Sequence, residues 1–194
     1  MKSVSHLPEG YREIFAVDLQ KNKKKGIFVN VIAGLILVAM VVPMAFFVPM
    51  STMFDVLEDW PRLLALVGAL VLYMVLHELV HGVAMKLCGT KKVKYGYTGI
   101  YAFAGSEDYY DRSAYIFIAL APVVFWGLVL LAVQFFVPLE WFWIVYWIQI
   151  ANCSGAAGDL YVTVKFSRLP KDILVKDHGV GMVVYSKEQS KESL

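Results

Sequence analysis

Four long apolar runs, separated by short polar stretches, dominate the pattern of hydrophobic and polar positions along this chain. Each run is long enough to cross the hydrocarbon core of a bilayer, roughly 30 Å thick, as a helix. The pattern therefore predicts an all-α membrane protein with four transmembrane helices and a small interfacial or cytoplasmic β element, folded as a single membrane domain over residues 1–194. The predicted spans cover residues 26–48, 62–87, 113–137 and 139–166, and residues 167–194 form a tail.

The composition supports this class of protein. Hydrophobic residues make up 59% of the chain, charged residues make up 18%, and the mean hydropathy is +0.60. Soluble domains are about 45–50% apolar even when glycine is counted, so the excess is typical of an integral membrane protein. The formal net charge of +2 gives no indication of a nucleic-acid partner, and we expect none. Cys88 and Cys153 fall in or beside predicted spans, where we expect small buried hydrophobic side chains.

Basic residues cluster in alternate loops and set the predicted orientation. They precede the first run, follow the second and follow the fourth, whereas the two other loops are acidic or nearly uncharged. Because Lys and Arg in short loops favour the cytoplasmic side, both termini and the middle loop are predicted to be cytoplasmic. The three clusters are Lys21, Lys23, Lys24 and Lys25; Lys91, Lys92, Lys94 and Arg112; and Lys165, Arg168, Lys171 and Lys176.

Three shorter segments have patterns of their own. Residues 93–103 are aromatic and β-prone, and a strand there could pair through its free edge with an extended peptide that Tyr95 and Tyr97 contact. The alternative is an interfacial hairpin that the tyrosines anchor. Residues 173–185 predict a small cytoplasmic hairpin. Residues 8–20 predict either a short interfacial helix or a loosely ordered tail.

The second run contains three titratable side chains, His77, Glu78 and His81, in the pattern H-E-x-x-H. On a helix, positions i and i+4 share one face, so the two imidazoles can bind one Zn²⁺. Glu78 is turned by about 100° from His77 and can act as general base for a metal-activated water. Each of these side chains costs about 2.5–3.5 kcal/mol or more at mid-bilayer. A metal site is therefore favoured over the alternative, a buried His/Glu hydrogen-bond cluster.

A catalytic zinc site needs three protein ligands and one open position, and Asp159 is the predicted third ligand. Asp159 precedes Lys165 by six residues, and His81 precedes Lys86 by five. The two side chains are therefore expected at a similar depth near the cytoplasmic leaflet. The alternative for Asp159 is an ordinary polar residue at a helix end. Asn152 shares a helical stripe with Asp159 and is predicted to bind substrate or stabilise an oxyanion; a helix–helix hydrogen bond is the alternative.

These residues resemble the arrangement of intramembrane site-2 proteases. Those enzymes carry H-E-x-x-H on one core helix and an Asn-x-x-Pro…Asp-Gly motif on another. The resemblance implies Zn²⁺ binding, a catalytic carboxylate and a substrate-holding amide. The residues that would carry these roles are His77, His81 and Asp159 as ligands, Glu78 as the catalytic group and Asn152 at the substrate.

The chain departs from the site-2 pattern at two positions, since Gly155 stands in place of the motif proline and Leu160 follows the aspartate. It is more similar to a bacterial family of small membrane proteins called putative zincin peptidases. In that family an H-E-L-x-H-G helix, a lysine-tyrosine-glycine loop and a late Gly-Asp recur, here at residues 77–82, 94–96 and 158–159. This resemblance extends over nearly the whole chain and implies a bacterial plasma membrane.

The leading interpretation is an intramembrane zinc metalloprotease that cleaves membrane-anchored peptide segments near the cytoplasmic leaflet, with Glu78 as general base. We expect Zn²⁺ as cofactor, a membrane protein or peptide as substrate, and a lipid bilayer around the helices. Two other classes stay open: a membrane metal-binding or transport protein without hydrolysis, and a non-catalytic regulator that binds transmembrane segments. Against transport, the first run contains no ionisable residue.

Overall fold

The computed structural model describes residues 2–17, 22–99, 102–179 and 181–187, and the chain folds as two compact units. The first unit combines Met1–Gly26, Glu78–Ala121 and Asp159–Leu194, and the second combines Ile27–His77 and Pro122–Gly158. The boundary passes through helix α3 (Trp60–Leu87) between His77 and Glu78. The predicted single membrane domain stays a prediction.

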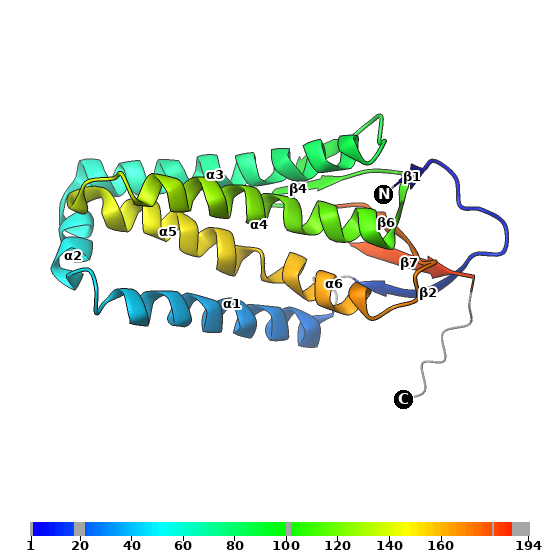
Figure 1. Cartoon of the computed structure of the whole chain (residues 1–194), viewed down its shortest axis with the longest axis horizontal. Helices are drawn as coiled ribbons and strands as arrows, with labels where there is room; N and C mark the ends of the chain where they lie inside the picture. The colour runs from blue at the N-terminus through cyan, green and yellow to red at the C-terminus, as the bar shows by residue number, and fades with distance from the viewer. Residues whose placement is uncertain (1, 18–21, 100–101, 180, 188–194) are drawn as a thin grey trace. The chain divides into compact units, whose positions relative to one another are not determined.

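A five-stranded antiparallel sheet organises the first unit (Figure 1). The strands of this unit are β1 (Ser3–Val4), β2 (Arg12–Val17), β3 (Lys94–Tyr97), β4 (Ala102–Gly105), β5 (Tyr109–Asp111), β6 (Leu174–Asp177) and β7 (Met182–Ser186). The order in the large sheet is β1-β5-β6-β7-β2, and β3 pairs with β4 in a separate two-stranded sheet. The large sheet therefore joins strands from the N-terminal segment, the middle of the chain and the C-terminal segment.

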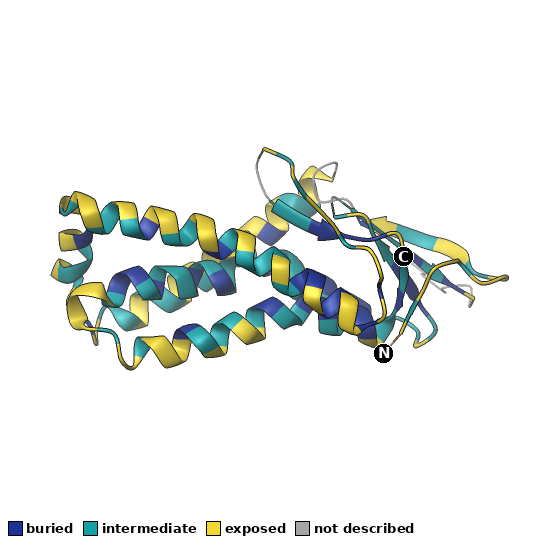
Figure 2. Cartoon of the chain, turned by 90° about the horizontal axis from the view of Figure 1, so that it is seen from above, coloured by how far each residue is buried: buried dark blue, intermediate teal, exposed yellow. Residues whose placement is uncertain are grey.

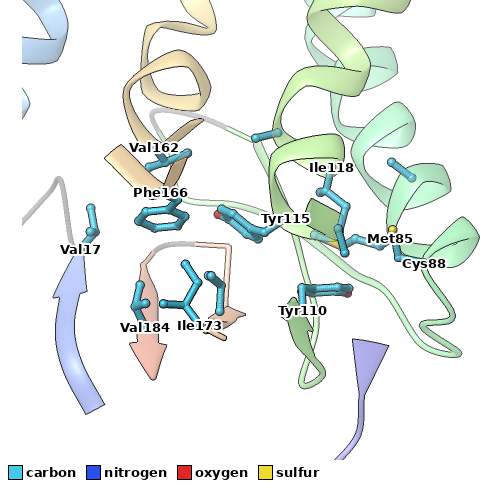
Figure 3. Close-up of a cluster of buried hydrophobic side chains, with 14 residues drawn as sticks. Val17, Met85, Cys88, Tyr110, Tyr115, Ile118, Val162, Phe166, Ile173 and Val184 are labelled. Atoms are coloured by element: carbon cyan, nitrogen blue, oxygen red, sulfur yellow. The ribbon is translucent and has the colours of Figure 1, made fainter. Parts of the chain in front are cut away.

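The core of the first unit consists of apolar side chains from this sheet, from α3, from α4 (Arg112–Gln134) and from α6 (Ala157–Ser167). Figure 3 shows Tyr115 of α4 beside Phe166 of α6, and their ring centroids are 5.4 Å apart. Val175 and Val184 are paired across β6 and β7, and both are fully buried. This core fixes the end of α3, the start of α4 and α6 from Asp159 onward on one sheet.

The second unit contains α2 (Met50–Glu58), α5 (Leu139–Gly155) and most of α1 (Lys23–Met44). The Trp143 indole N–H donates to the Pro49 carbonyl at 3.3 Å, and the Tyr146 hydroxyl donates to the Met40 carbonyl at 2.9 Å. Of the 22 residues of α1, all of them described, only Val29 is buried. Figure 2 shows many exposed positions along the long helices, as expected for apolar helices that face lipid.

The prediction of an all-α fold with four transmembrane helices is wrong. Within the described residues, three helices are long and apolar enough to cross a membrane, namely α1, α3 and α4, and a five-stranded sheet accompanies them. The fourth apolar run forms two helices of 17 and 11 residues, which are separated at Ala156. Gly155 and Gly158 flank this break, and each glycine lowers helix propensity by about 1 kcal/mol relative to alanine.

The predictions for the two terminal segments, residues 8–20 and residues 173–185, differ in how they compare with the structure. Both alternatives predicted for residues 8–20, an interfacial helix and a loosely ordered tail, are wrong for Arg12–Val17, which forms strand β2, and residues 18–20 lie outside the described part. Pairing with β7 provides ladder hydrogen bonds that a surface helix would not have, and a bulge between Glu13 and Phe15 adjusts the register. The hairpin predicted near the C-terminus is confirmed as β6 and β7.

Candidate metal centre

Helix α3 carries the H-E-x-x-H motif and runs without interruption from Trp60 to Leu87. His77 and His81 lie four positions apart, so helical geometry places them one turn apart on one face. Glu78 is partly buried and lies about 100° around the helix from His77. The spacing predicted from the sequence is therefore present on a regular helix.

His81 is buried, with 9% of its surface exposed, and its ring is oriented from both nitrogens. Nδ1 lies 2.9 Å from the carbonyl oxygen of Ile118 on α4. Because a carbonyl oxygen only accepts, Nδ1 carries the proton of the neutral ring. Nε2 then faces Asp159, whose Oδ1 lies 3.7 Å away. A ring nitrogen bound to a carbonyl is the usual support for a histidine that ligates metal through its other nitrogen.

Asp159 owes its position to the break between α5 and α6. It lies in the first turn of α6, where the helix dipole favours a negative charge. Further along the same helix, Val162 and Phe166 are 2% and 0% exposed in the core of the first unit. The core therefore anchors the helix that presents the carboxylate to His81.

His77 is oriented by a second hydrogen bond. Its Nδ1 lies 2.8 Å from the hydroxyl of Tyr73, one turn earlier on α3. The same hydroxyl donates to Oδ1 of Asn152 on α5 at 2.8 Å. The rings of Tyr73 and His77 meet edge to face, with centroids 5.7 Å apart.

The three predicted ligands converge. His77, His81 and Asp159 each offer one ligand atom, and these atoms all lie within 4.8 Å of one another. In a tetrahedral zinc site with bonds of about 2.0–2.1 Å, two ligand atoms lie about 3.3 Å apart, so the 3.7 Å between His81 and Asp159 requires little adjustment. Two imidazoles and one carboxylate also form the ligand set of catalytic zinc sites with one open position. The residues present therefore fit Zn²⁺, and ligation itself stays a prediction.

Asn152 is completely buried, and both ends of its amide are hydrogen-bonded. Oδ1 accepts from Tyr73, and Nδ2 donates to the carbonyl oxygen of Val123 at 3.0 Å. This is the helix–helix hydrogen bonding that the sequence left open as an alternative. The substrate contact stays a prediction.

Tyr95 and Tyr97 lie on strand β3 and are 48% and 63% exposed. The hydroxyl of Tyr95 lies directly against α3 at Gly82, where an added Cβ would come within 1.8 Å of it. The hydroxyl of Tyr97 donates to the Gly99 carbonyl at 3.0 Å. Strand β3 is thus packed beside the residue that follows His81, and its two tyrosines keep accessible surface.

Two polar residues near the candidate ligands are not predicted from the sequence. Tyr73 looked like an apolar helix residue, and only its i−4 spacing from His77 could have identified it. The second is Asp177 on β6, which accepts from the Tyr115 hydroxyl at 2.6 Å and from the Gly179 N–H at 2.7 Å. Burial raises the pKa of the Asp177 carboxyl, although these two hydrogen bonds act in the opposite direction.

The fold contains three helices long and apolar enough to cross a membrane, and the site brings together two histidines and one carboxylate that fit a metal ion. The chain belongs to the family described as "Putative zincin peptidase", whose sequence profile matches residues 70–174, more than half of the 194 residues. The matched segment contains His77, Glu78, His81 and Asp159. The family's description names zincin peptidases as its class of protein.

A curated relative supports a wider similarity without adding an activity. The chain is 31% identical over 125 residues to the "Uncharacterized 24.7 kDa protein in gap 5'region" of Pyrococcus woesei. The aligned segment covers 60% of this chain and 53% of that protein, so the chain spans about half the length of this relative. No solved structure matches the chain.

Proposed function

We propose that this protein is an intramembrane zinc metallopeptidase of the site-2-protease type, which cleaves membrane-anchored peptide segments near the cytoplasmic leaflet. The observation that carries the proposal is the convergence of ligand atoms from His77, His81 and Asp159 within 4.8 Å. Two of these residues lie on α3, which is long and apolar enough to cross a membrane. Family membership independently indicates zinc and peptidase chemistry.

In the proposed mechanism, His77, His81 and Asp159 would hold the metal, and Glu78 would move the proton. Zinc, when bound, supplies a Lewis acid that polarises the peptide carbonyl and acidifies water. Glu78 accepts a proton from the attacking water and returns it to the leaving amine as the peptide bond breaks. The Ile118 carbonyl holds the His81 ring through Nδ1, so that this ligand keeps its orientation while the proton moves.

We propose strand β3 as the surface that presents the peptide. Within the described residues, β3 pairs with β4 on one side, which leaves its other edge for an extended segment. Tyr95 brings this strand against α3 at Gly82, next to His81. Tyr95 and Tyr97 would contact the side chains of a bound peptide, whereas a purely structural hairpin would use them as interfacial anchors.

We infer that both termini lie on the cytoplasmic side. Strand β2 from the N-terminal segment pairs with β7 from the C-terminal segment, and β1 pairs with β5 from the region between α3 and α4. A bilayer does not pass between hydrogen-bonded strands, because the separated backbone groups would lose their partners. Lys91, Lys92 and Lys94 in that middle region supply the positive charge typical of the cytoplasmic side. A bacterial plasma membrane stays a prediction from resemblance.

The test of this function compares the wild-type chain with Glu78→Gln in proteoliposomes that contain membrane-anchored reporter peptides. We expect Glu78→Gln to keep one equivalent of zinc and to lose cleavage by a factor of about 10²–10⁴, because the substituted amide cannot accept the proton. Glu140→Gln is the matched control, since Glu140 is an exposed carboxylate in the first turn of α5. It should cleave like the wild type.

Two outcomes would overturn parts of this proposal. Undiminished cleavage by Glu78→Gln would exclude Glu78 as the base. Stoichiometric zinc without cleavage of any reporter would instead support a non-catalytic membrane protein that binds metal or transmembrane segments.

A further inference from the structure

We propose that Tyr73 and Asn152 form a hydrogen-bonded relay that fixes the tautomer of His77 and so keeps its Nε2 lone pair available to zinc. This inference rests on the zinc site proposed above and adds two positioning residues to it. The relay runs from the Val123 carbonyl on α4 through Asn152 on α5 to Tyr73 and His77 on α3.

The orientation of the Asn152 amide decides which groups donate and which accept along the relay. Its Nδ2 lies 3.0 Å from the carbonyl oxygen of Val123, which can only accept. If the amide were reversed, its Oδ1 would face that carbonyl, and two acceptors would meet without a proton between them. The amide oxygen therefore points toward Tyr73, whose hydroxyl oxygen lies 2.8 Å away.

The Tyr73 hydroxyl transmits this direction to His77. A phenol has one proton, and the amide oxygen of Asn152 requires it. Toward His77 the hydroxyl can then only accept, so the Nδ1 atom at 2.8 Å must carry the ring proton. In the neutral ring the lone pair is consequently on Nε2, the atom that remains for a metal.

The surroundings keep the relay dry and well fitted. Asn152 is 0% exposed and Tyr73 is 9% exposed, so both polar groups depend on partners within the protein. A Cβ added at Gly127 would lie 3.4 Å from Asn152 Nδ2, an ordinary contact distance, so the amide packs directly against α4. With both ends of its amide occupied, Asn152 is better placed to orient His77 than to hold a substrate.

The same tautomer results at His81 from a different acceptor. There the backbone carbonyl of Ile118 receives the Nδ1 proton directly. A backbone carbonyl cannot change its role, whereas a tyrosine hydroxyl can rotate and donate. His77 therefore needs Asn152 to set the role of Tyr73, and His81 needs no comparable residue.

The first experiment measures the tautomer of His77 in the metal-free full chain, labelled with ¹⁵N-histidine and solubilised in detergent. The chain contains four histidines, and His6→Gln and His178→Gln simplify the assignment. Two-bond proton–nitrogen correlations should show His77 protonated at Nδ1 in the wild type and a mixture of both forms in Tyr73→Phe. Protonation of wild-type His77 at Nε2 would overturn the proposal.

The second experiment measures zinc affinity by competition with a chromophoric chelator. Tyr73→Phe and Asn152→Ala should each weaken zinc binding by about 10–100-fold, the usual effect of removing a group that orients a ligand. Because Asn152 acts through Tyr73, adding Asn152→Ala to Tyr73→Phe should cause little further loss. If the loss of zinc affinity in the double variant equalled the product of the two single losses, the relay would be refuted. Unchanged zinc affinity in Tyr73→Phe would refute it as well.

Matched controls come from the same unit. Tyr146→Phe removes another tyrosine hydroxyl that donates to a backbone carbonyl, and Gln149→Ala removes another amide of α5. Both should keep the zinc affinity of the wild type, and an equal loss in the controls would show a merely structural effect. If the wild type bound no zinc, the proposed function would fail, while the tautomer measurement would still decide the relay.

Discussion

Gly82 provides a sharp test of how strand β3 meets the metal-binding helix. A Cβ added at Gly82 would lie 1.8 Å from the Tyr95 hydroxyl oxygen and 2.6 Å from its ring carbon Cζ. An ordinary contact begins at 3.4 Å, so the Tyr95 ring would have to retreat by about 1.6 Å in Gly82→Ala. Gly68 lies on the same helix and has no atom within 4 Å of an added Cβ, which makes Gly68→Ala the matched control.

Two opposing effects set the expected change in the free energy of unfolding of Gly82→Ala. Replacing glycine by alanine inside a helix stabilises it by up to about 1 kcal/mol. Overpacking costs about 1–3 kcal/mol, and the low end applies because Tyr95 is half exposed and can swing outward. We therefore expect Gly68→Ala to raise the free energy of unfolding by about 1 kcal/mol and Gly82→Ala to leave it nearly unchanged.

The assay is thermal unfolding of the detergent-solubilised chain, combined with zinc content and cleavage of a membrane-anchored reporter. In a Tyr95→Ala background the obstruction is absent, so Gly82→Ala should stabilise as much as Gly68→Ala. Gly82→Ala in the wild-type background should keep zinc, because α3 is intact, and should cleave more slowly, because the Tyr95 side chain on the proposed docking edge is displaced. Equal stabilisation by both alanines in the wild-type background would refute the contact between Tyr95 and α3. Unchanged cleavage would refute a role of Tyr95 in peptide docking.

Three further perturbations test other parts of the structure. Asp159→Ala should weaken zinc binding by at least about 10-fold, because it removes one of three ligands, whereas the control Asp55→Ala on α2 should bind zinc like the wild type. If Asp159→Ala and the wild type had equal zinc affinity in a chelator competition, Asp159 would not be a ligand. Tyr115→Phe should lower the free energy of unfolding by about 1–3 kcal/mol, because the buried Asp177 carboxylate loses a donor, and an unchanged denaturation midpoint would contradict this. Hydrogen bonds from Lys94 and then Lys176 lower the pKa of Glu107 from 4.5 to about 2. The stabilising effect of the Glu107 carboxylate is therefore complete above pH 4.5 and lost as the pH falls through 2, so the melting temperatures of the wild type and Glu107→Gln should converge between these values. The difference at neutral pH should shrink in high salt, because the group is fully exposed.

The candidate ligands could be predicted from the sequence because their signals are local or depend on depth alone. The H-E-x-x-H spacing needs only a regular helix, and α3 supplies one. The distance from Asp159 to the flanking lysine predicts its depth, and this reasoning still holds with α6 as a separate helix, because Lys165 lies on the same helix as Asp159.

The sheet could not be predicted in the same way, because its pairing is between segments far apart in the chain. Arg12–Val17 has apolar residues that fit one face of a short helix, and it is a strand because it pairs with β7, far away in the chain at Ser186 and Tyr185. The break at Ala156 was hidden within a continuous apolar run, where small residues indicated close packing as readily as a helix end. The relay through Tyr73 depends on α5 lying beside α3, which hydrophobic periodicity does not specify.

The central claim is that two imidazoles and one carboxylate hold a single zinc ion, and zinc X-ray absorption spectroscopy on the purified full chain tests it most directly. The structure predicts one zinc per chain, bound by two imidazole nitrogens and by oxygen ligands, with the imidazole signal lost in His77→Ala/His81→Ala. A chain purified without stoichiometric zinc, even after incubation with the ion, would contradict the claim. So would a sulfur ligand, which could come only from Cys88 or Cys153 or from a methionine.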